Sequence, residues 1–259
     1  MSLAAAQHLM KALDANQGTT PVRDLLPADD YQAAYETQAA FNQLRLERGQ
    51  RMIGRKAGFT NPTAQAAMGV TFPVAGVLFD VMDIPHNGVI AAEQVTAPKI
   101  EAEIAFIMGV DLDHDNISTA DVMRAIDYVV PAIEIANTRI ADWNVTGVDA
   151  IADNVSASQF VIGHKAQTLD QFDVTTARAD IHVDGESVAQ GATANVLGSP
   201  LNSLKWLANQ LVSMNVPIQE GDIILSGSLG PMVPVAKGSQ VDVFIEGAGS
   251  VSVSFAADA

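Results

Sequence analysis

The sequence predicts an α+β fold in which a small helical N-terminal region precedes a mixed, largely antiparallel β body. Two observations support this. Apolar residues recur at roughly helical intervals near the start of the 259-residue chain, whereas short β-branched runs separated by Gly, Pro and Asn dominate from about residue 51. Few helices interrupt these runs, which argues against a doubly wound parallel sheet. We therefore expect a helical region over residues 1–50 and a β-rich domain over residues 51–259.

Two helices are predicted in the N-terminal region, at residues 3–15 and 29–48. The second has Asp29 or Asp30 near its start, and Tyr31, Ala34 and Phe41 recur along it at helical spacing. The segment Thr19-Thr20-Pro21 separates the two helices as a breaker and turn. Gly49 ends this part of the chain.

The rest of the chain is predicted to be mainly strands, at residues 51–57, 88–90, 100–108, 129–136, 158–163, 180–184, 222–226, 241–246 and 250–255. Helices are expected at 62–68, 118–127 and 200–214. Ser118 with Asp121 resembles a capping box, and Pro200 suits the first turn of the last helix.

Composition excludes several classes of function. A formal net charge of −16 disfavours binding to nucleic acid or to anionic membranes. The absence of cysteine excludes disulfides, thiol nucleophiles and thiolate metal sites. No apolar run approaches the ~18 residues of a membrane span, and the N-terminus lacks the charge pattern of a signal peptide. A cytoplasmic location is the expectation.

Two glutamates, Glu101 and Glu103, interrupt the apolar run of residues 100–108. On a strand, side chains alternate between faces, so both carboxylates share one face while Ala102 and Ile104 face the core. Like charges side by side are costly to bury unless a cation neutralises them. Glu134 adds a third carboxylate in a similar apolar run, and three carboxylates favour Mg²⁺ or Mn²⁺ over zinc. The alternative is that these glutamates lie on a solvated sheet face.

Lys56 lies in a short run between Gly54 and Gly58. Facing inward beside a metal, it could bind a substrate carboxylate, polarise a carbonyl or act as a base. By itself, the segment favours an edge strand that exposes this lysine.

Three further polar residues are candidates for the site. Asp153 and Asn154 could position water or substrate, or could simply form an Asx turn. Ser228 lies in a Ser/Gly turn whose hydroxyl and backbone N–H groups could hold an anion, although such turns are common.

In combination, these segments resemble the 2-keto-4-pentenoate hydratase / 4-oxalocrotonate decarboxylase family of the fumarylacetoacetate hydrolase superfamily. The resemblance covers nearly the whole chain and rests on several motifs in order: Gly-Arg-Lys-Ala-Gly-Phe-Thr (54–60), Pro-Lys-Ile-Glu-Ala-Glu-Ile-Ala-Phe (98–106), Val-Pro-Ala-Ile-Glu (130–134), Ile-Ala-Asp-Asn (151–154), Ser-Gly-Ser-Leu-Gly-Pro-Met (226–232) and Gly-Ala-Gly-Ser-Val (247–251).

The resemblance implies a mixed β-sandwich roll with a small helical N-terminal region. It implies Mg²⁺ or Mn²⁺ bound by Glu101, Glu103 and Glu134, and Lys56 in the active site. Asp153 and Asn154 would line the pocket, and Ser228 would face a small-molecule substrate. The family also implies a homo-oligomer, a pentamer or decamer.

The implied substrate is a 2-hydroxy-2,4-dienoate from aromatic-ring cleavage, chelated to the metal through its C1 carboxylate and C2 oxygen. The metal would stabilise negative charge on the C2 oxygen as the enol becomes a ketone, which makes C4 electrophilic. Addition of water at C4 would then give a 4-hydroxy-2-oxo acid. Lys56 would offset the negative charge of the carboxylates where this anion docks.

Two positions depart from the hydratase pattern. Val74 stands where hydratases usually have an acid, and Asn137-Thr138-Arg139 replaces Asp-Ser-Arg. Val74 is more like the decarboxylases, whereas the segment at 228–232 is more like the hydratases. The alternative to a hydratase is therefore a 4-oxalocrotonate-type decarboxylase, which needs a second carboxylate-binding cation. Lys99 and Arg139 are the candidates for it. A catalytically inactive partner of an active homologue is a third hypothesis.

Overall fold

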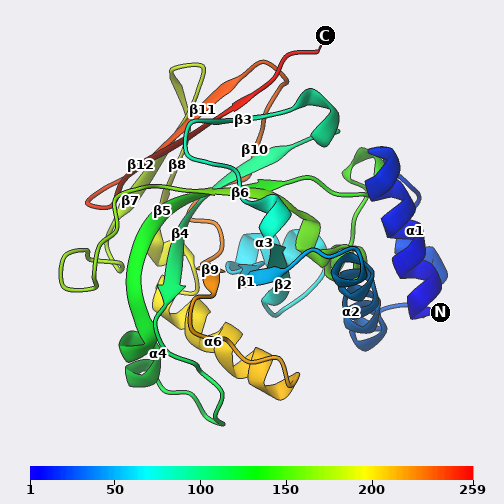
Figure 1. Cartoon of the computed structure of the whole chain (residues 1–259), viewed down its shortest axis with the longest axis horizontal. Helices are drawn as coiled ribbons and strands as arrows, with labels where there is room; N and C mark the ends of the chain where they lie inside the picture. The colour runs from blue at the N-terminus through cyan, green and yellow to red at the C-terminus, as the bar shows by residue number, and fades with distance from the viewer. Residues whose placement is uncertain (259) are drawn as a thin grey trace.

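The computed structural model describes residues 1–258 as two curled β-sheets with helices at their edges (Figure 1). The larger sheet has the order β2-β1-β9-β4-β5-β6, and β10 pairs with β4. Its members are β1 (Met52–Gly58), β2 (Val74–Phe79), β4 (Lys99–Met108), β5 (Ile126–Ala136), β6 (Ala157–Ile162), β9 (Ile223–Leu225) and β10 (Val233–Pro234).

The smaller sheet has the order β3-β12-β11-β7-β8. It packs against one face of β4 and β5 through buried apolar residues of both sheets. Only the β1–β9 and β3–β12 pairs are parallel among the ladders of the described chain, so the body is largely antiparallel as predicted. Its members are β3 (Gly88–Ile90), β7 (Arg178–Val183), β8 (Glu186–Ala192), β11 (Gln240–Ile245) and β12 (Gly249–Phe255).

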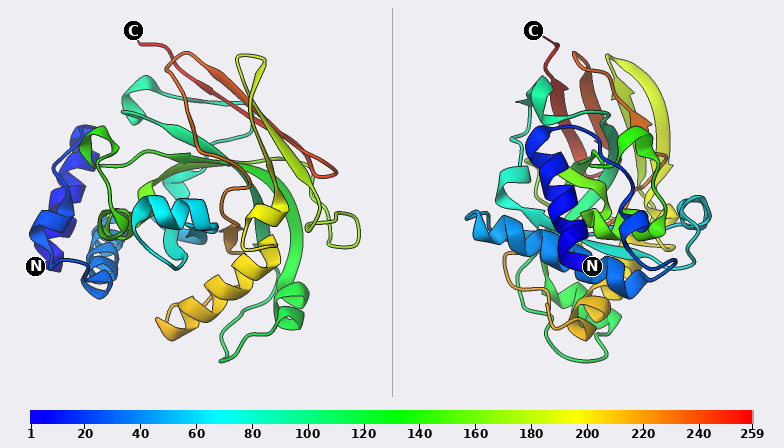
Figure 2. Two further views of the ribbon diagram at one scale, coloured as in Figure 1. Left: turned by 180° about the vertical axis from the view of Figure 1, so that it is seen from behind. Right: turned by 90° about the vertical axis from the view of Figure 1, so that its right-hand side faces the viewer.

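Two N-terminal helices, α1 (Ser2–Ala15) and α2 (Tyr31–Glu47), lie side by side at one end of the molecule (Figure 2). Asp30 caps α2 by accepting a hydrogen bond from the Ala33 amide at 2.9 Å. The apolar faces of both helices share a core with Val74 and Ile151 of the β-rich part. Neither these nor the other helices within residues 1–258 are both long and apolar enough to cross a bilayer.

The remaining helices are α3 (Pro62–Met68), α4 (Thr119–Ala125), α5 (Gly147–Ala152) and α6 (Pro200–Ser213). The predicted capping box of α4 is confirmed, because Ser118 and Asp121 exchange hydrogen bonds. Pro200 begins α6, and the Ser199 hydroxyl accepts from the Leu201 amide. Each predicted helix and strand is present, with boundaries shifted by at most three residues. Strands β2, β8 and β10 and helix α5 are additional to the prediction.

Strand β4 is buried on both faces, which explains its continuous apolar character. Ala102, Ile104 and Phe106 are fully buried against the smaller sheet and α6, as expected. The opposite face carries Ala105 and Glu103, and it packs against a separate apolar cluster around Phe160. The expected glutamate face is therefore inside the protein and not on a solvated surface.

Candidate metal centre and active-site cavity

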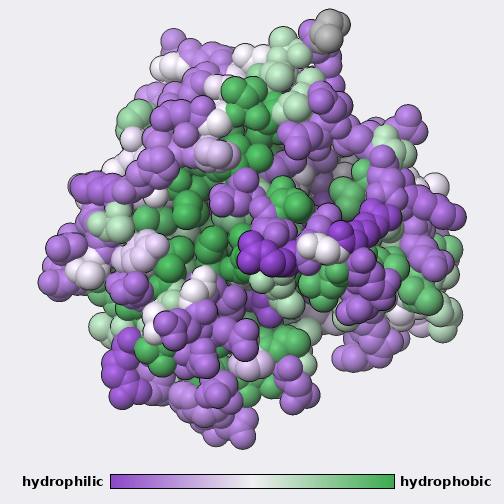
Figure 3. All heavy atoms as spheres, in the orientation of Figure 1, coloured by the Kyte–Doolittle hydropathy of each residue, from purple (hydrophilic) through white to green (hydrophobic). Residues whose placement is uncertain are grey.

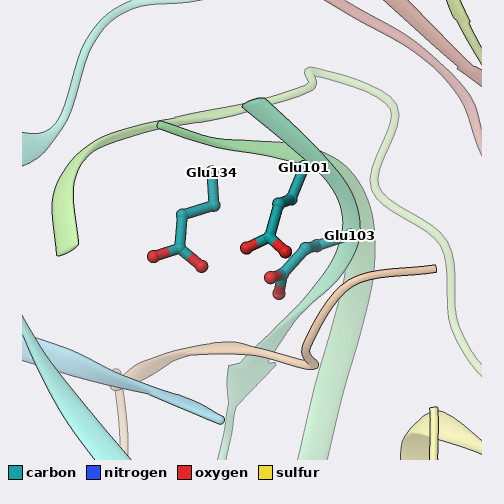
Figure 4. A group of neighbouring side chains, drawn as sticks. All are labelled: Glu101, Glu103 and Glu134. Atoms are coloured by element: carbon teal, nitrogen blue, oxygen red, sulfur yellow. The ribbon is translucent and has the colours of Figure 1, made fainter. Parts of the chain in front are cut away.

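Three glutamate side chains converge beneath the larger sheet (Figure 4). Glu101 and Glu103 project from β4, and Glu134 projects from the neighbouring strand β5. One carboxylate oxygen of each lies within 4.8 Å of the others. The strand register produces this cluster, because Glu101 pairs directly with Glu134 and Glu103 lies two residues further along the same face.

The carboxylates are buried and poorly satisfied by the protein. Glu103 Oε2 accepts a hydrogen bond from the Gly227 amide at 2.7 Å, but Glu103 Oε1 and both oxygens of Glu134 have no hydrogen-bond donor within the described chain. Buried acceptors without partners are rare because each costs free energy of desolvation, about 1–3 kcal/mol or more for a charged group. These oxygens are therefore available as ligands.

Lys56 supplies one compensating charge. Its ammonium lies 2.5 Å from Glu134 Oε1, an ion contact whose alignment is too poor for a hydrogen bond, and it donates to the Val155 carbonyl at 3.2 Å. Burial lowers the pKa of Lys56, but the three carboxylates, Glu134 first, outweigh burial and leave this pKa above its ordinary value. The lysine is therefore a protonated, buried cation.

The pKa values of Glu101 and Glu103 are raised. Burial, followed by the charge of Glu134, raises the pKa of Glu101 to about 7. Burial and the two neighbouring carboxylates raise the pKa of Glu103 well above its usual range. Without a further positive charge, the cluster is strained electrostatically.

The donor set fits a hard divalent cation. It consists of carboxylate oxygens with no sulfur and no histidine in the cluster, which suits Mg²⁺ or Mn²⁺. Three carboxylates, one dication and the Lys56 ammonium sum to zero charge. A dication therefore satisfies both the unpaired oxygens and the charge balance of this site.

The glutamate cluster adjoins a cavity of about 1000 Å³, which it reaches through Glu101. Glu101, Lys56 and Ser228 line it, and Thr60, Asn195 and Ser156 add polar groups. Its walls are otherwise largely apolar, formed by residues such as Phe59, Met68, Trp143, Val145, Leu197 and Met232. Figure 3 shows apolar side chains gathered across the middle of one face of the molecule, between rims of polar residues.

Local backbone requirements explain how the lysine and the glutamates reach the cavity. Gly76 on β2 pairs with Lys56, and a Cβ at residue 76 would lie 2.9 Å from the Lys56 Cγ. Gly227 has φ of +97°, and a Cβ there would lie 2.5 Å from the Thr60 side chain. Glycine at these two positions therefore allows the lysine stem to pass and the Gly227 amide to approach Glu103.

Asn154 was expected to line the cavity, but its side chain is bound to strand β2 instead. Its side chain accepts from the Val77 amide and donates to the Val77 carbonyl, both at 2.8 Å, and it does not line the cavity. Asn154, Val155 and Ser156 have φ values of 52°, 53° and 56°, a left-handed turn that is unusual for valine. The turn directs the Val155 carbonyl to Lys56, so Asn154 holds the segment that positions the lysine.

Asp153 and Arg139 also lie outside the cavity lining. They form a buried ion pair, and the Thr138 hydroxyl donates to Asp153 at 2.7 Å. The Arg139 guanidinium also donates to the carbonyls of Asn137, Asp153 and Ala157. The structure therefore places Arg139 away from the expected substrate position, because its hydrogen-bonding capacity is used within the protein.

Lys99 lies behind the cavity wall. Its ammonium is 3.9 Å from the centroid of the Trp143 ring, and Trp143 is a lining residue. The indole donates to the Ala97 carbonyl at 2.8 Å, which fixes the ring between the lysine and the cavity. The sequence-based candidates do not include Trp143, Val155 or Ser156. An isolated tryptophan and a left-handed Val-Ser pair have no sequence signature that marks a functional site.

Comparison with known proteins agrees with this geometry. Residues 63–256 match the family model described as fumarylacetoacetate (FAA) hydrolase C-terminal. The chain is 43% identical over 252 residues to the "TodF product hydratase" of Pseudomonas putida strain F1, with 97% of this chain and 94% of that protein covered. It is 41% identical over 257 residues to "2-keto-4-pentenoate hydratase 1" of Dechloromonas aromatica strain RCB, with 99% and 98% covered.

A solved structure with the same fold is the 4-oxalocrotonate decarboxylase from Pseudomonas putida G7, complexed with magnesium and adipate. It has a TM-score of 0.94 and 34% sequence identity, and covers 98% of this chain and 97% of that one. The same decarboxylase complexed with calcium and acetate has a TM-score of 0.92. On the family model and these relatives, the chain belongs to the fumarylacetoacetate hydrolase family.

Proposed function

We propose that this protein is a divalent-metal-dependent hydratase that adds water to a 2-hydroxy-2,4-dienoate and forms a 4-hydroxy-2-oxo acid. The observation that carries the proposal is the cluster of three glutamate carboxylates, with three oxygens that accept no hydrogen bond, beside a protonated Lys56 and a largely apolar cavity that Glu101 and Lys56 line. The relatives named 2-keto-4-pentenoate hydratase, at 37–41% identity, support this substrate class.

Glu101, Glu103 and Glu134 would hold Mg²⁺ or Mn²⁺. The bound ion would supply Lewis-acid stabilisation of negative charge on the substrate's C2 oxygen. Lys56 holds its proton on Nζ and lowers the net negative charge that an anionic substrate meets. The Val155 carbonyl and Glu134 fix this ammonium at one side of the carboxylate cluster. Ser228 lines the cavity beside Glu101, and we assign it to substrate binding.

The charge of the cavity favours hydration over decarboxylation. Among the described lining residues, Lys56 alone is positively charged. The lining is otherwise largely apolar, with Phe59 and Met232 among its residues, so it suits the hydrocarbon part of a monocarboxylate. A dicarboxylate would leave its second charge against apolar side chains, at a cost of several kcal/mol if unpaired.

A 4-oxalocrotonate-type decarboxylase is the second candidate. Val74, which resembles the decarboxylases, is fully buried in the apolar core shared with the N-terminal helices. The structural likeness to a decarboxylase complexed with adipate, a dicarboxylate, also favours it. Lys99 is a second cation whose charge acts on Glu101, and its ammonium lies against Trp143, a residue of the cavity lining.

The proposal also includes four features that the family resemblance supports. These are a homo-oligomer, as a pentamer or decamer, a cytoplasmic location, a role in aromatic catabolism, and a helical N-terminal region over residues 1–50 distinct from a catalytic domain over residues 51–259. Asp153, Asn154 and Arg139 contribute by positioning the wall of the site, through the contacts described above.

A single assay separates the candidate functions. The decay of dienol absorbance is followed with and without Mg²⁺, and CO₂ release is measured in parallel. Metal-dependent decay without CO₂ is the result expected of a hydratase. Stoichiometric CO₂ from a 2-oxo dicarboxylate would establish the decarboxylase instead, and no turnover of either substrate with metal bound would favour the inactive partner.

A further inference from the structure

A second cavity, of about 380 Å³, lies between the N-terminal helices and the ends of β5 and β6. It shares no lining residue with the glutamate cavity. Its walls are mainly polar, and they include the amides of Gln17, Gln50 and Gln159 and the hydroxyl of Ser158. Three arginines line it. Arg45 lies in the last turn of α2, Arg48 follows the end of that helix, and Arg139 follows β5.

The three arginines differ in how their charges are balanced. Arg48 pairs with Asp14, and Arg139 pairs with Asp153. Arg45 is only 4% exposed, yet no carboxylate within residues 1–258 lies within ion-pair distance of it. Two acidic residues line the cavity: Asp14 is paired with Arg48, and Glu93 is exposed and forms no ion pair with Arg45.

The guanidinium of Arg45 is held so that one edge remains free. Its Nε donates to Gln50 Oε1 at 2.7 Å, and its Cζ lies 4.3 Å from the centroid of the Phe79 ring. The two terminal nitrogens form no hydrogen bond with the described residues. Burial, followed by the charges of Arg139 and Arg48, lowers the pKa of Arg45 to about 9, although the more distant carboxylates of Asp153 and Asp80 act in the opposite direction. Arg45 therefore still carries its charge at neutral pH.

A buried charge without a partner is strongly unfavourable, and proteins tolerate it where a ligand supplies the opposite charge. We propose that this cavity is a binding site for a small carboxylate, which pairs with the two terminal nitrogens of Arg45. Two parallel N–H donors on a planar fork match the two oxygens of a carboxylate. The side-chain amides of Gln17, Gln50 and Gln159, which line the same cavity, carry N–H donors for the remaining lone pairs of the ligand.

The test is thermal unfolding of the full-length protein in sodium acetate, at constant ionic strength balanced with sodium chloride. EDTA is present so that acetate cannot bind through a metal at the glutamates. The wild-type melting temperature is expected to rise with acetate in a saturable manner, by roughly 5 °C at 100 times Kd. A parallel titration with phosphate distinguishes a carboxylate site from a general oxyanion site. A carboxylate site should bind acetate at least tenfold more tightly than it binds phosphate.

Arg45→Met removes the fork while retaining an apolar stem over Phe79, and it should abolish the acetate response. In the absence of acetate, this variant should melt at or above the wild-type temperature, because the unpaired charge is gone. Arg48→Gln is the matched control: it removes an exposed, already paired arginine of the same cavity and should retain the response. Arg45→Lys, which keeps the charge without the fork, should respond at least tenfold more weakly.

Three outcomes would overturn the site. One is a wild-type melting temperature that follows ionic strength alone. Another is an acetate response that survives in Arg45→Met. The third is an Arg45→Met variant that melts well below the wild type already in the absence of acetate, because this result indicates that Arg45 supports the packing of α2.

Discussion

Glu101 and Glu134 lie directly opposite one another on the antiparallel strands β4 and β5. Directly opposed side chains have Cβ atoms about 5 Å apart, and like charges in this position destabilise a sheet. The pair is therefore unfavourable unless a cation lies between its carboxylates, which Glu103 also approaches. The strand register thus brings the three carboxylates together as a candidate site for a divalent ion.

Glu103→Gln is the first prediction. Removal of one ligand charge should weaken Mg²⁺ or Mn²⁺ binding and lower metal-dependent turnover by at least about 10²–10³-fold, as for loss of one key electrostatic group. The metal-free variant should melt no lower than the wild type, because a carboxyl group that burial and two neighbouring carboxylates disfavour in its charged form is replaced by a neutral amide. Calorimetric titration with Mn²⁺ and thermal unfolding measure the two effects. The matched control is Glu186→Gln, an exposed glutamate on β8, and unchanged turnover in Glu103→Gln would refute the metal assignment.

Lys56→Met should distinguish the role of the lysine from that of the candidate metal ligands. Lys56 and a dication neutralise the same carboxylates, so the variant should bind Mn²⁺ at least about tenfold more tightly, given the strength of a buried charge contact. Turnover should nevertheless fall, because the ammonium no longer faces the substrate. Tighter metal binding together with lower activity is the expected pattern. Loss of metal binding in this variant would instead indicate that Lys56 holds the cluster together.

Much of the fold follows from sequence periodicity. Alternation identified β4 and the shared face of Glu101 and Glu103, since side-chain direction in a strand is a local property. The pairing of Glu134 with Glu101 is not local, because it depends on the register between β4 and β5. The sequence could therefore supply the ligand residues, whereas their convergence required the family resemblance or the structure.

The features that the sequence analysis missed or misplaced all depend on tertiary contacts. Strand β2 (Val74–Phe79) includes Gly76 and follows a proline, so its β propensity is weak and its pairing with β1 determines it. The turn at residues 154–156 is left-handed at a valine, which local preference disfavours. Contacts with Val77 and Lys56 determine this turn. Tertiary contacts also account for Arg139, whose burial with Asp153 no local pattern indicates.

The pH dependence of stability follows from the raised pKa values of Glu101 and Glu103. A carboxyl whose pKa is higher in the folded state than in the unfolded state binds its proton more tightly when folded. Its contribution to stability is complete below the unfolded pKa and is lost as pH rises through the folded pKa. The metal-free protein should therefore lose stability between about pH 4.5 and pH 7, where Glu101 titrates.

Bound metal should reverse this trend. Protons compete with the ion for the carboxylates, so metal affinity should rise as pH increases through about 7. Melting curves from pH 4.5 to 8, with EDTA or with saturating Mg²⁺, should diverge progressively at the upper end. Parallel curves over the whole range would contradict a shared proton and metal site.

Gly76→Ala should displace the lysine without removing it. A methyl group at residue 76 would lie 2.9 Å from the Lys56 Cγ and 3.1 Å from the Asn154 carbonyl oxygen, both too close for an undisturbed side chain. We expect destabilisation of about 1–3 kcal/mol from overpacking, and a fall in turnover larger than the fall in Mn²⁺ affinity. Chemical unfolding and calorimetry check these effects. Equal losses in activity and metal binding would mean that the whole cluster had moved.

Asn154→Ala distinguishes positioning from direct participation in the reaction. Its two hydrogen bonds to Val77 are the link between the left-handed turn and β2, and their loss should cost about 1–3 kcal/mol of unfolding free energy. The Val155 carbonyl would then no longer be held against Lys56, so the pH profile of turnover should shift together with kcat. Asn154→Asp preserves the acceptor for the Val77 amide and should recover part of the stability. A variant of normal stability with an unshifted pH profile and no activity would show that Asn154 acts on the substrate directly.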